Sequence, residues 1–229
     1  NYEYGKSAVS AFRNIMAEKR PDLTWVGEQW PPLGKIDAGP LIQALAQNEP
    51  QAIFNATFGA DLAQFVREGD TRGLFKDRAV VSLLTGEPEY LDPLGAEAPV
   101  GWIVTGYPWY AITTPAHQAF LDAYRRAYDD YPRLGSVVGY VAMKTVAAII
   151  AKAGSTDTDK MIVAAEGIEV DSPFGPISFR AADHQSTMGA FVGRIALKDG
   201  KGIMVDWHYA DGADYLPPPA AVKALRPAE

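Results

Sequence analysis

The stretch Ala79-Val80-Val81-Ser82-Leu83-Leu84 (residues 79–84) decides the fold, because five of its six residues are apolar and turn signals bound it. A short run of this kind is typical of a strand buried on both faces, as in a parallel sheet covered by helices. Residues 52–57 form a similar short apolar segment before it, and residues 102–105 form another after it. We therefore expect these three segments to be strands of one sheet.

The segments around these strands carry helical patterns. Apolar residues recur at three- and four-residue spacing in 7–19, 40–47 and 60–68, which indicates amphipathic helices. Residues 24–30 instead alternate and are rich in β-forming residues, so we expect a further strand there. Strands alternating with helices over short connections predict an α/β lobe with a parallel sheet and helices on both faces, covering residues 1–106.

The pattern changes after residue 106. Helical spacing is predicted over 115–128, 136–153 and 158–166, the last capped by Asp157 or Thr158, with almost no strand between them. An Asp199-Gly200 pair then joins two apolar segments, 191–197 and 202–209, as in a β-hairpin, and a Pro217-Pro218-Pro219 run begins an exposed tail. We divide this part into a helical segment, 107–188, and a segment, 189–229, that returns to the first lobe described.

Composition excludes several classes of function. The 229 residues are 48% hydrophobic and 21% charged, as in an ordinary globular protein, and the net charge of −7 provides no basic surface for nucleic acid. The chain has no cysteine, so disulfides, thiolate metal sites and cysteine nucleophiles are excluded. No apolar run approaches the length of about 18 residues that a membrane helix needs.

No common catalytic signature is present. The chain lacks Gly-x-Ser-x-Gly, P-loop, Gly-x-Gly-x-x-Gly and His-Glu-x-x-His motifs. The three histidines, His117, His184 and His208, have no ligand spacing, so we expect no metal site and no cofactor. Asp157 and Asp159 fit helix capping better than a calcium loop, which needs a glycine and a final glutamate.

Candidate ligand contacts follow the predicted strands. Glu87 comes just after the strand that ends at residue 84, and Phe58 lies in the loop after 52–57, where ligands bind in open parallel sheets. Tyr107 and Trp109 lie where the chain leaves the first lobe, at a position suited to a hinge and a cleft wall. The alternatives are a surface role for Glu87, a core role for Phe58 and an interface role for the other two aromatic residues.

Several motifs together resemble the type I periplasmic binding proteins, and within them the branched-chain amino acid and amide group of ABC-transporter substrate-binding proteins. The resemblance extends over almost the whole chain and lies in the order of its motifs. These are the segments 1–7, 32–37 and 51–54, the Gly139-Tyr140 pair, the segments 153–157 and 172–180, and the Asp199-Gly200 turn.

The resemblance implies a protein with two Rossmann-like lobes that close on a small solute. Residues 1–106 would form the core of the second lobe, 107–188 the helices of the first lobe, and 189–229 a return to the second. The chain opens on a loop that leads directly into a helix, without a strand before it. We therefore expect a longer protein, whose earlier part would supply the sheet of the first lobe and its ligand contacts.

The resemblance also implies roles for individual residues. Tyr4 matches the tyrosine of the family's opening loop that contacts ligand, and Phe58 matches the aromatic residue after a second-lobe strand. The acidic residue that binds the ligand ammonium in amino-acid binders falls near Thr85 to Glu87. If Glu87 does not face the cleft, an aromatic or other organic acid becomes the expected ligand, stacked on the rings of Tyr4, Phe58, Tyr107 and Trp109.

The resemblance implies a receptor without catalytic residues, exported to the periplasm. Its partners would be a small solute (an amino acid, an amide or an aromatic carboxylate) and an ABC permease in the inner membrane, with no nucleic acid. A second hypothesis is an amide- or small-molecule-sensing regulator, or a hydrolase that uses Glu87 or His184, on the same fold. A scaffold that binds no solute is a third.

Overall fold

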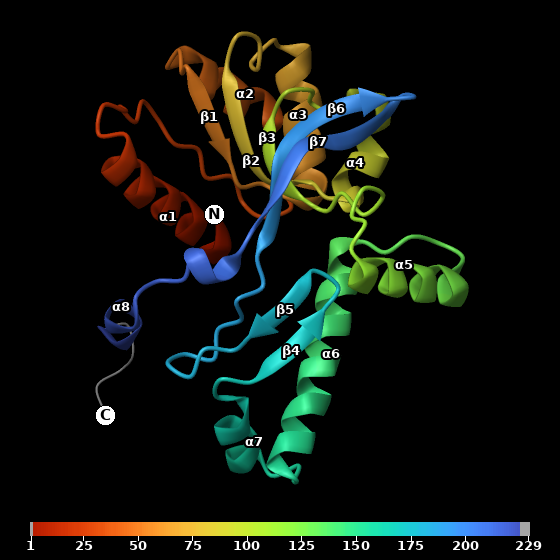
Figure 1. Cartoon of the computed structure of the whole chain (residues 1–229). Helices are drawn as coiled ribbons and strands as arrows, with labels where there is room; N and C mark the ends of the chain where they lie inside the picture. Colours follow the sequence, from red (N-terminus) through yellow and green to blue (C-terminus); the bar gives the residue numbers. More distant parts are fainter. Residues whose placement is uncertain (1, 225–229) are drawn as a thin grey trace. The chain divides into compact units, whose positions relative to one another are not determined.

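The structure is a computed structural model that describes residues 2–224, and its chain divides into two compact units (Figure 1). The first unit comprises Asn1–Gly106 and Val192–Trp207, and the second comprises Tyr107–Phe191 and His208–Glu229. The chain therefore passes from one unit to the other three times. The assignment of these segments to two lobes of a longer protein stays a prediction.

The first unit is built on a five-stranded sheet with the strand order β1-β2-β3-β6-β7. β1 pairs in parallel with β2, and β2 in parallel with β3, as the apolar runs predict. Helices follow the strands along the chain (Figure 1). The elements are α1 (Glu3–Lys19), α2 (Ala38–Gln47), β1 (Ala52–Asn55), α3 (Gly59–Thr71), β2 (Ala79–Gly86), α4 (Pro88–Leu94), the 3₁₀ turn η1 (Gly95–Glu97), β3 (Ile103–Gly106), β6 (Ala190–Lys198) and β7 (Lys201–Ala210).

Burial explains this arrangement. Val80 and Val104, from neighbouring central strands, are almost fully buried, as are Leu62 and Phe65 on one face of α3. Phe65 also lies against Trp102, with their ring centroids 6.3 Å apart, so α3 packs on the sheet through the apolar face that its spacing predicts. The mixed α/β class with a parallel sheet is thus confirmed.

One prediction for the first unit is wrong, and one helix was not predicted. Residues 24–30 adopt no regular secondary structure and join no sheet, so β1 stands at the edge. An alternating pattern shows only that a segment suits a half-buried, extended surface. A strand forms only if the segment also pairs with the edge of a sheet, and residues 24–30 do not. Residues 88–94, to which the sequence analysis assigned no element, form the helix α4, whose first position is the proline Pro88.

The second unit contains three consecutive helices and a small antiparallel sheet. The expectation of almost no strand is wrong, because β4 and β5 form a hairpin closed at Ser172 and Gly175. The Ser172 hydroxyl donates to the Gly175 carbonyl at 2.7 Å and stabilises the turn. The elements are α5 (Pro115–Tyr128), α6 (Leu134–Ala153), α7 (Thr158–Ala165), β4 (Glu169–Ser172), β5 (Gly175–Ser178), the 3₁₀ turn η2 (Gly212–Asp214) and α8 (Pro219–Ala224).

The termini of these helices agree with their sequences. α7 is capped by Asp157, whose carboxylate accepts from the Lys160 backbone N–H at 3.1 Å. Asp199 and Gly200, both with positive φ, form the turn between β6 and β7, as the Asp-Gly signal predicts. The proline run, interpreted as the start of a tail, leads into α8, and the rest of that tail lies outside the described residues.

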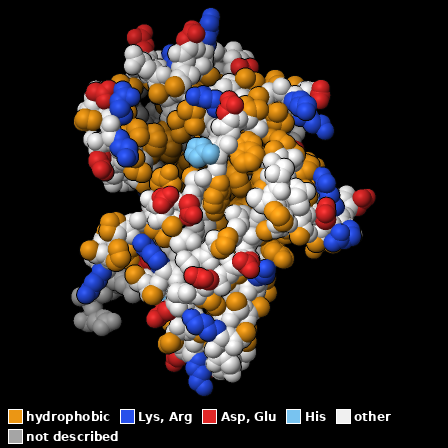
Figure 2. Space-filling view, in the orientation of Figure 1, with side chains coloured by type: hydrophobic (Ala, Val, Ile, Leu, Met, Phe, Trp, Pro, Cys, Tyr) orange, Lys and Arg blue, Asp and Glu red, His pale blue; other side chains and the backbone are white. Residues whose placement is uncertain are grey.

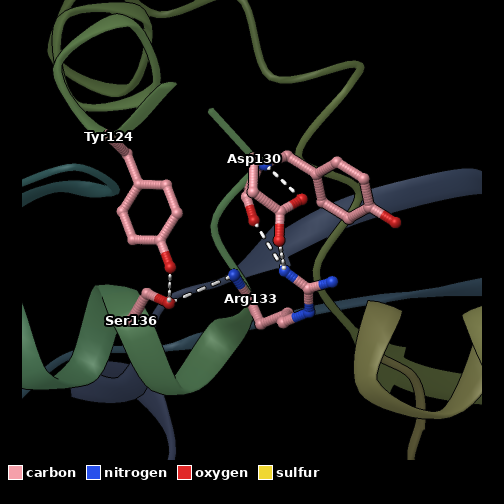
Figure 3. Close-up of polar contacts among 5 residues, drawn as sticks. Tyr124, Asp130, Arg133 and Ser136 are labelled. Atoms are coloured by element: carbon pink, nitrogen blue, oxygen red, sulfur yellow. Dashed lines mark hydrogen bonds and ion pairs between the residues drawn. The ribbon is translucent and has the colours of Figure 1, made fainter. Parts of the chain in front are cut away.

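A polar cluster fixes the connection between α5 and α6 (Figure 3). The Arg133 backbone N–H donates to the Ser136 hydroxyl at 3.3 Å, and Ser136 donates to the Tyr124 hydroxyl at 3.3 Å. The Arg133 guanidinium pairs with Asp130 at 2.6 Å. Tyr124 comes from α5 and Ser136 from α6, so the cluster orients these two helices relative to each other.

Helix α6 exposes much of its apolar surface. By length and composition alone, this helix could cross a membrane: its most apolar 18 residues have a mean hydropathy of 1.7, and 17% of them are buried. The expectation that no apolar run is long enough for a membrane helix is therefore wrong. The expectation was wrong because the helix contains only two charged residues, Lys144 and Lys152, and its average composition stays apolar despite them. Its exposed apolar residues are Val138, Tyr140, Met143 and Val146.

Charges are mixed over the surface. On the face shown in Figure 2, Lys and Arg side chains are interspersed with Asp and Glu and form no single basic cluster. The sequence is acidic as a whole, with a net charge of −7. On this face, the distribution is that of an ordinary globular surface rather than a polyanion-binding one.

Candidate functional site

A hydrogen-bonded network occupies the carboxyl ends of β1 and β2. The Asn55 amide donates to the Ser82 hydroxyl at 2.8 Å, and Ser82 lies 2.6 Å from the Thr85 hydroxyl. The Asn55 carbonyl oxygen accepts from the Thr57 hydroxyl at 2.9 Å and from its backbone N–H at 3.1 Å. The network therefore holds the loop that carries Phe58 against the end of β2.

A bulge in β2 sets the position of Thr85 and Glu87. The register with β3 shifts between Ser82 and Gly86, and Leu84 has a φ of 67°, which is unusual for a branched residue. The Leu84 backbone N–H donates to the Thr105 hydroxyl at 2.9 Å, which compensates the interrupted ladder. The bulge turns Thr85 inward, and the chain then leaves the sheet at Glu87.

The predicted ligand contact Thr85 is fully buried in this network. Its hydroxyl lies close to Ser82, so the described packing makes Thr85 a support for the loop. Its contact with a solute stays a prediction.

Tyr4 and Phe58 are brought together, as the prediction requires. Their ring centroids lie 5.9 Å apart at 81°, an edge-to-face contact. Tyr2 adds a second contact with Phe58, at 6.4 Å between centroids. Tyr4 stays 36% exposed and Phe58 is half-buried, so both rings retain surface that a solute can contact.

Glu87 is buried without a cationic partner. It occupies the N-cap position of α4 without a side-chain capping hydrogen bond, and it is 6% exposed. Burial, and secondarily the charge of Glu89, raise the pKa of Glu87 from 4.5 to about 8. Among residues 2–224, ion pairs with acids other than Glu87 are formed by the arginines Arg13, Arg20, Arg67, Arg72, Arg133 and Arg180. The group is therefore mostly a neutral carboxylic acid at pH 7.

Tyr90 belongs to the same cluster and was missed from the sequence. Burial and the nearby Glu87 raise its pKa, whereas a hydrogen bond with the backbone of Gly59 lowers it. Tyr90 therefore links α4 to the first residue of α3, next to Phe58. The pKa of Tyr4 is also raised, by burial first and then by Glu87 and Tyr90, which places these side chains in one electrostatic neighbourhood.

A signal for Tyr90 existed in the sequence. Glu87 is followed by Pro88, and proline at the first helical position would have indicated a helix start. Tyr90 lies three residues after Glu87, and the two groups are close enough to interact electrostatically. We define the Tyr4, Phe58, Glu87 and Tyr90 side chains as the Glu87 half-site.

An apolar cavity of about 210 Å³ adjoins the half-site within the first unit. Phe58 and Tyr2 contribute to its wall, and further lining comes from α1, α2, β1, α3, the loops at 48–50 and 56–57, and the segment 24–33. Trp25 and Phe54 give it an aromatic lining. The cavity lies beside β1, where the predicted strand 24–30 is absent.

Tyr107 lies in the core of the second unit. It is 1% exposed, and its hydroxyl is 2.7 Å from Nε2 of His117, which is itself fully buried. Burial lowers the pKa of His117, which favours the neutral ring in this contact. The described packing accounts for Tyr107 as a core residue, and its solute contact stays a prediction.

Trp109 packs within the same unit. Its ring stacks on Tyr131, with centroids 4.4 Å apart at 12°, and the Arg125 guanidinium lies 5.2 Å from its centroid. Both contacts lie within the second unit. The predicted solute contact of Trp109 also stays a prediction.

The described residues offer no metal site, since residues 2–224 contain no group of three His, Asp or Glu side chains placed to hold an ion. The two residues of the hydrolase hypothesis, Glu87 and His184, belong to different units. His184 lies in a turn with a φ of 58°, where its backbone N–H donates to the Arg180 carbonyl at 2.7 Å.

An α/β unit with rings and a buried acid beyond the carboxyl ends of parallel strands is typical of small-molecule-binding proteins. The profile of the family described as periplasmic binding protein matches residues 1–201, and the chain belongs to that family. Membership implies an extracytoplasmic location. No curated protein matches the sequence.

Solved structures show the same fold. The chain is similar to an amino acid ABC transporter substrate-binding protein from Pseudomonas fluorescens Pf-5, with 18% identity, a TM-score of 0.79, and coverage of 96% of this chain and 59% of that one. It is similar to a solute-binding protein from Rhodopseudomonas palustris HaA2 in complex with p-hydroxybenzoic acid, with 22% identity, a TM-score of 0.79, and coverage of 98% and 61%. These likenesses establish the type I periplasmic binding protein fold. The chain spans about 60% of the length of these two proteins.

Proposed function

We propose that the chain is part of the solute-binding receptor of an ABC importer. It would bind a small amino acid, an amide, or an aromatic or other organic acid in a cleft between two lobes. Family membership and the Glu87 half-site support the proposal. The single observation that carries it is the pairing of the Tyr4 and Phe58 rings beside a buried acid at the strand ends.

The mechanism would be hinge closure without covalent chemistry. A solute that contacts both lobes binds the closed state better than the open one, and this difference in affinity shifts the population toward closure. The three passages of the chain between the units are the segments that would bend. Tyr107 and Trp109, which follow the first passage, are the proposed contacts on the other side of the cleft.

The helical segment 107–188 would belong to the first lobe. α6 carries an apolar surface that is only partly buried, which supports the presence of a further layer over it. The relatives are longer than this chain, and their additional length would supply that layer. The partners would be a small solute and an inner-membrane permease that accepts the closed form, with the protein in the periplasm and no cofactor.

A hydrolase on the same fold is the second candidate. The observation that favours it is the pKa of Glu87, which at about 8 suits a general acid near neutral pH. Turnover separates the two candidates, because a receptor binds its solute without changing it.

The test is a binding screen of the full-length protein by thermal shift and calorimetry against amino acids, amides and aromatic carboxylates. A solute at a hundredfold excess over its Kd should stabilise the protein by about 2.7 kcal/mol. Tyr4→Ala should weaken a hit by about 1–3 kcal/mol, whereas Tyr215→Ala, at a tyrosine that is 71% exposed, should leave it unchanged. Product formation from amides or esters, or the absence of any saturable binding, would overturn the receptor proposal.

A further inference from the structure

The apolar cavity of about 210 Å³ lies within the first unit and has no part in the proposed solute binding. Of the Glu87 half-site residues, Phe58 alone also contributes to its wall, whereas Tyr4, Glu87 and Tyr90 do not. The cavity and the half-site therefore share one ring and are otherwise separate.

The cavity meets β1 along the edge of the sheet. The consecutive residues 52–57 all line it, and successive side chains of a strand point to opposite faces. A surface in contact with all of them runs along the strand rather than over one face. β1 stands at the end of the strand order and pairs with β2 on its other side. The cavity therefore borders backbone N–H and C=O groups that the sheet does not use, and a ligand can hydrogen-bond to them.

Aromatic rings held by their own contacts form part of the wall. Phe54 from β1 and Trp25 both line the cavity. Phe12 from α1 stacks on Phe54, with ring centroids 4.0 Å apart at 6°, and meets Trp25 edge-to-face at 6.3 Å. Because Phe12 fixes both lining rings, the wall is organised for a planar ring before any ligand binds. Trp30 and Leu33 also line the cavity and keep exposed apolar surface that a ligand can cover.

The charges of the wall are compensated within the protein. Glu28 pairs with Arg13 at 2.9 Å. Asp61 accepts from the backbone N–H groups of Gly34 at 2.7 Å and of Ile36 at 3.2 Å. Among the residues that the structure describes, no Lys or Arg lines the cavity. A carboxylate would therefore be desolvated beside two acids, whereas an uncharged molecule avoids this cost.

We propose that this cavity is a second ligand site, which takes an uncharged molecule with a single aromatic ring and one hydroxyl group. Apolar cavities of about 150 Å³ bind benzene, so a cavity of about 210 Å³ accommodates a ring with a short substituent. The ring would lie among Trp25, Phe54 and Phe58, and the hydroxyl would hydrogen-bond at the outer edge of β1. This site differs from the proposed interlobe cleft in its position and in its exclusion of carboxylates.

The experiment is a fluorine NMR titration of the full-length protein at pH 7 with 4-fluorobenzyl alcohol. We expect saturable binding with a Kd on the order of 1 mM or tighter. Unlabelled benzoate, which carries the same ring and a negative charge, is then added in excess. It should not displace the alcohol, even if it binds in the interlobe cleft.

Two variants on α1 test whether the alcohol binds in this cavity. Gly5 and Val9 both line it, one helical turn apart, and a Cβ added at Gly5 would meet no atom within 4 Å. Gly5→Phe and Val9→Phe should each fill the cavity and weaken the alcohol at least about tenfold. The matched control is Ser10→Phe, at an exposed position of the same helix, which should change the Kd by less than about twofold. Circular dichroism checks that each variant folds.

Failure of the alcohol to bind saturably, or its displacement by benzoate, would overturn the inference. Full affinity in folded Gly5→Phe and Val9→Phe would also overturn it, as would an equal loss in Ser10→Phe, because binding would then not depend on the cavity. None of these outcomes requires a solute in the interlobe cleft. The proposed receptor function is therefore tested separately.

Discussion

Replacing Glu87 with glutamine should change how the stability of the protein depends on pH. In the unfolded chain the Glu87 carboxyl has an ordinary pKa of 4.5, whereas in the folded protein its pKa is about 8. Between these values the folded state binds the proton and the unfolded state does not. Stability contributed by this group is therefore complete below pH 4.5 and is lost as the pH rises toward 8.

The magnitude follows from the two pKa values. The full difference corresponds to a free energy of unfolding on the order of 5 kcal/mol, of which about 3 kcal/mol falls between pH 5 and pH 8. Because Glu87 is only 6% exposed, solvent screening reduces this value little. Glu87→Gln removes the titration while preserving size and shape. As the pH rises from 5 to 8, the free energy of unfolding of Glu87→Gln should therefore increase by about 3 kcal/mol relative to that of the wild type.

The assay is urea unfolding of both proteins, without solute, at half-unit steps from pH 5 to pH 8. Glu18→Gln is the matched control, because Glu18 lies exposed on α1 and should track the wild type at every pH. If the difference between Glu87→Gln and the wild type stayed constant from pH 5 to pH 8, the buried acid would not be protonated. The assignment of Glu87 as a neutral acid in the folded protein would then be refuted.

Three other substitutions test the packing by urea unfolding. Asn55→Ala should cost about 1–3 kcal/mol, because it removes one partner of the buried Ser82 hydroxyl and the side-chain acceptor of Thr57; no loss would show that the network is dispensable. Tyr107→Phe should cost a similar amount by removing the hydroxyl beside buried His117, and a neutral result would contradict that contact. On α6, Val146→Lys at a 40% exposed site should change the stability of this chain by less than about 0.5 kcal/mol, whereas Val141→Lys at a 4% exposed site should cost several times more.

Periodicity in the sequence was enough for most elements of regular structure. The helix Pro115–Tyr128 has the predicted bounds, and the apolar run from Ala79 begins β2. These elements are decided locally, because apolar spacing, proline at a helix start and an Asp-Gly turn act over a few residues. The helix α4 was missed although the same kind of signal, Pro88, was present.

Part of the candidate site was also within reach of the sequence. Tyr4, Phe58 and Glu87 were selected from their places after strands and from the family resemblance, and the structure brings these three together in one unit. Thr85 and Tyr107 were selected on the same grounds, but both side chains are buried and hydrogen-bonded. Position after a strand does not determine where a side chain points, because a single bulge can turn it inward.

The sequence by itself determined the α/β class, the positions of most helices and strands and the absence of cysteine chemistry, because these depend on local pattern and composition. Only the tertiary structure decided that residues 24–30 join no sheet and that Tyr90 completes the cluster around Glu87. It also decided the protonation of Glu87, because the pKa of an acid depends on which groups surround it and how much water reaches it. Those neighbours come from α1 and α4, more than eighty residues apart in the chain.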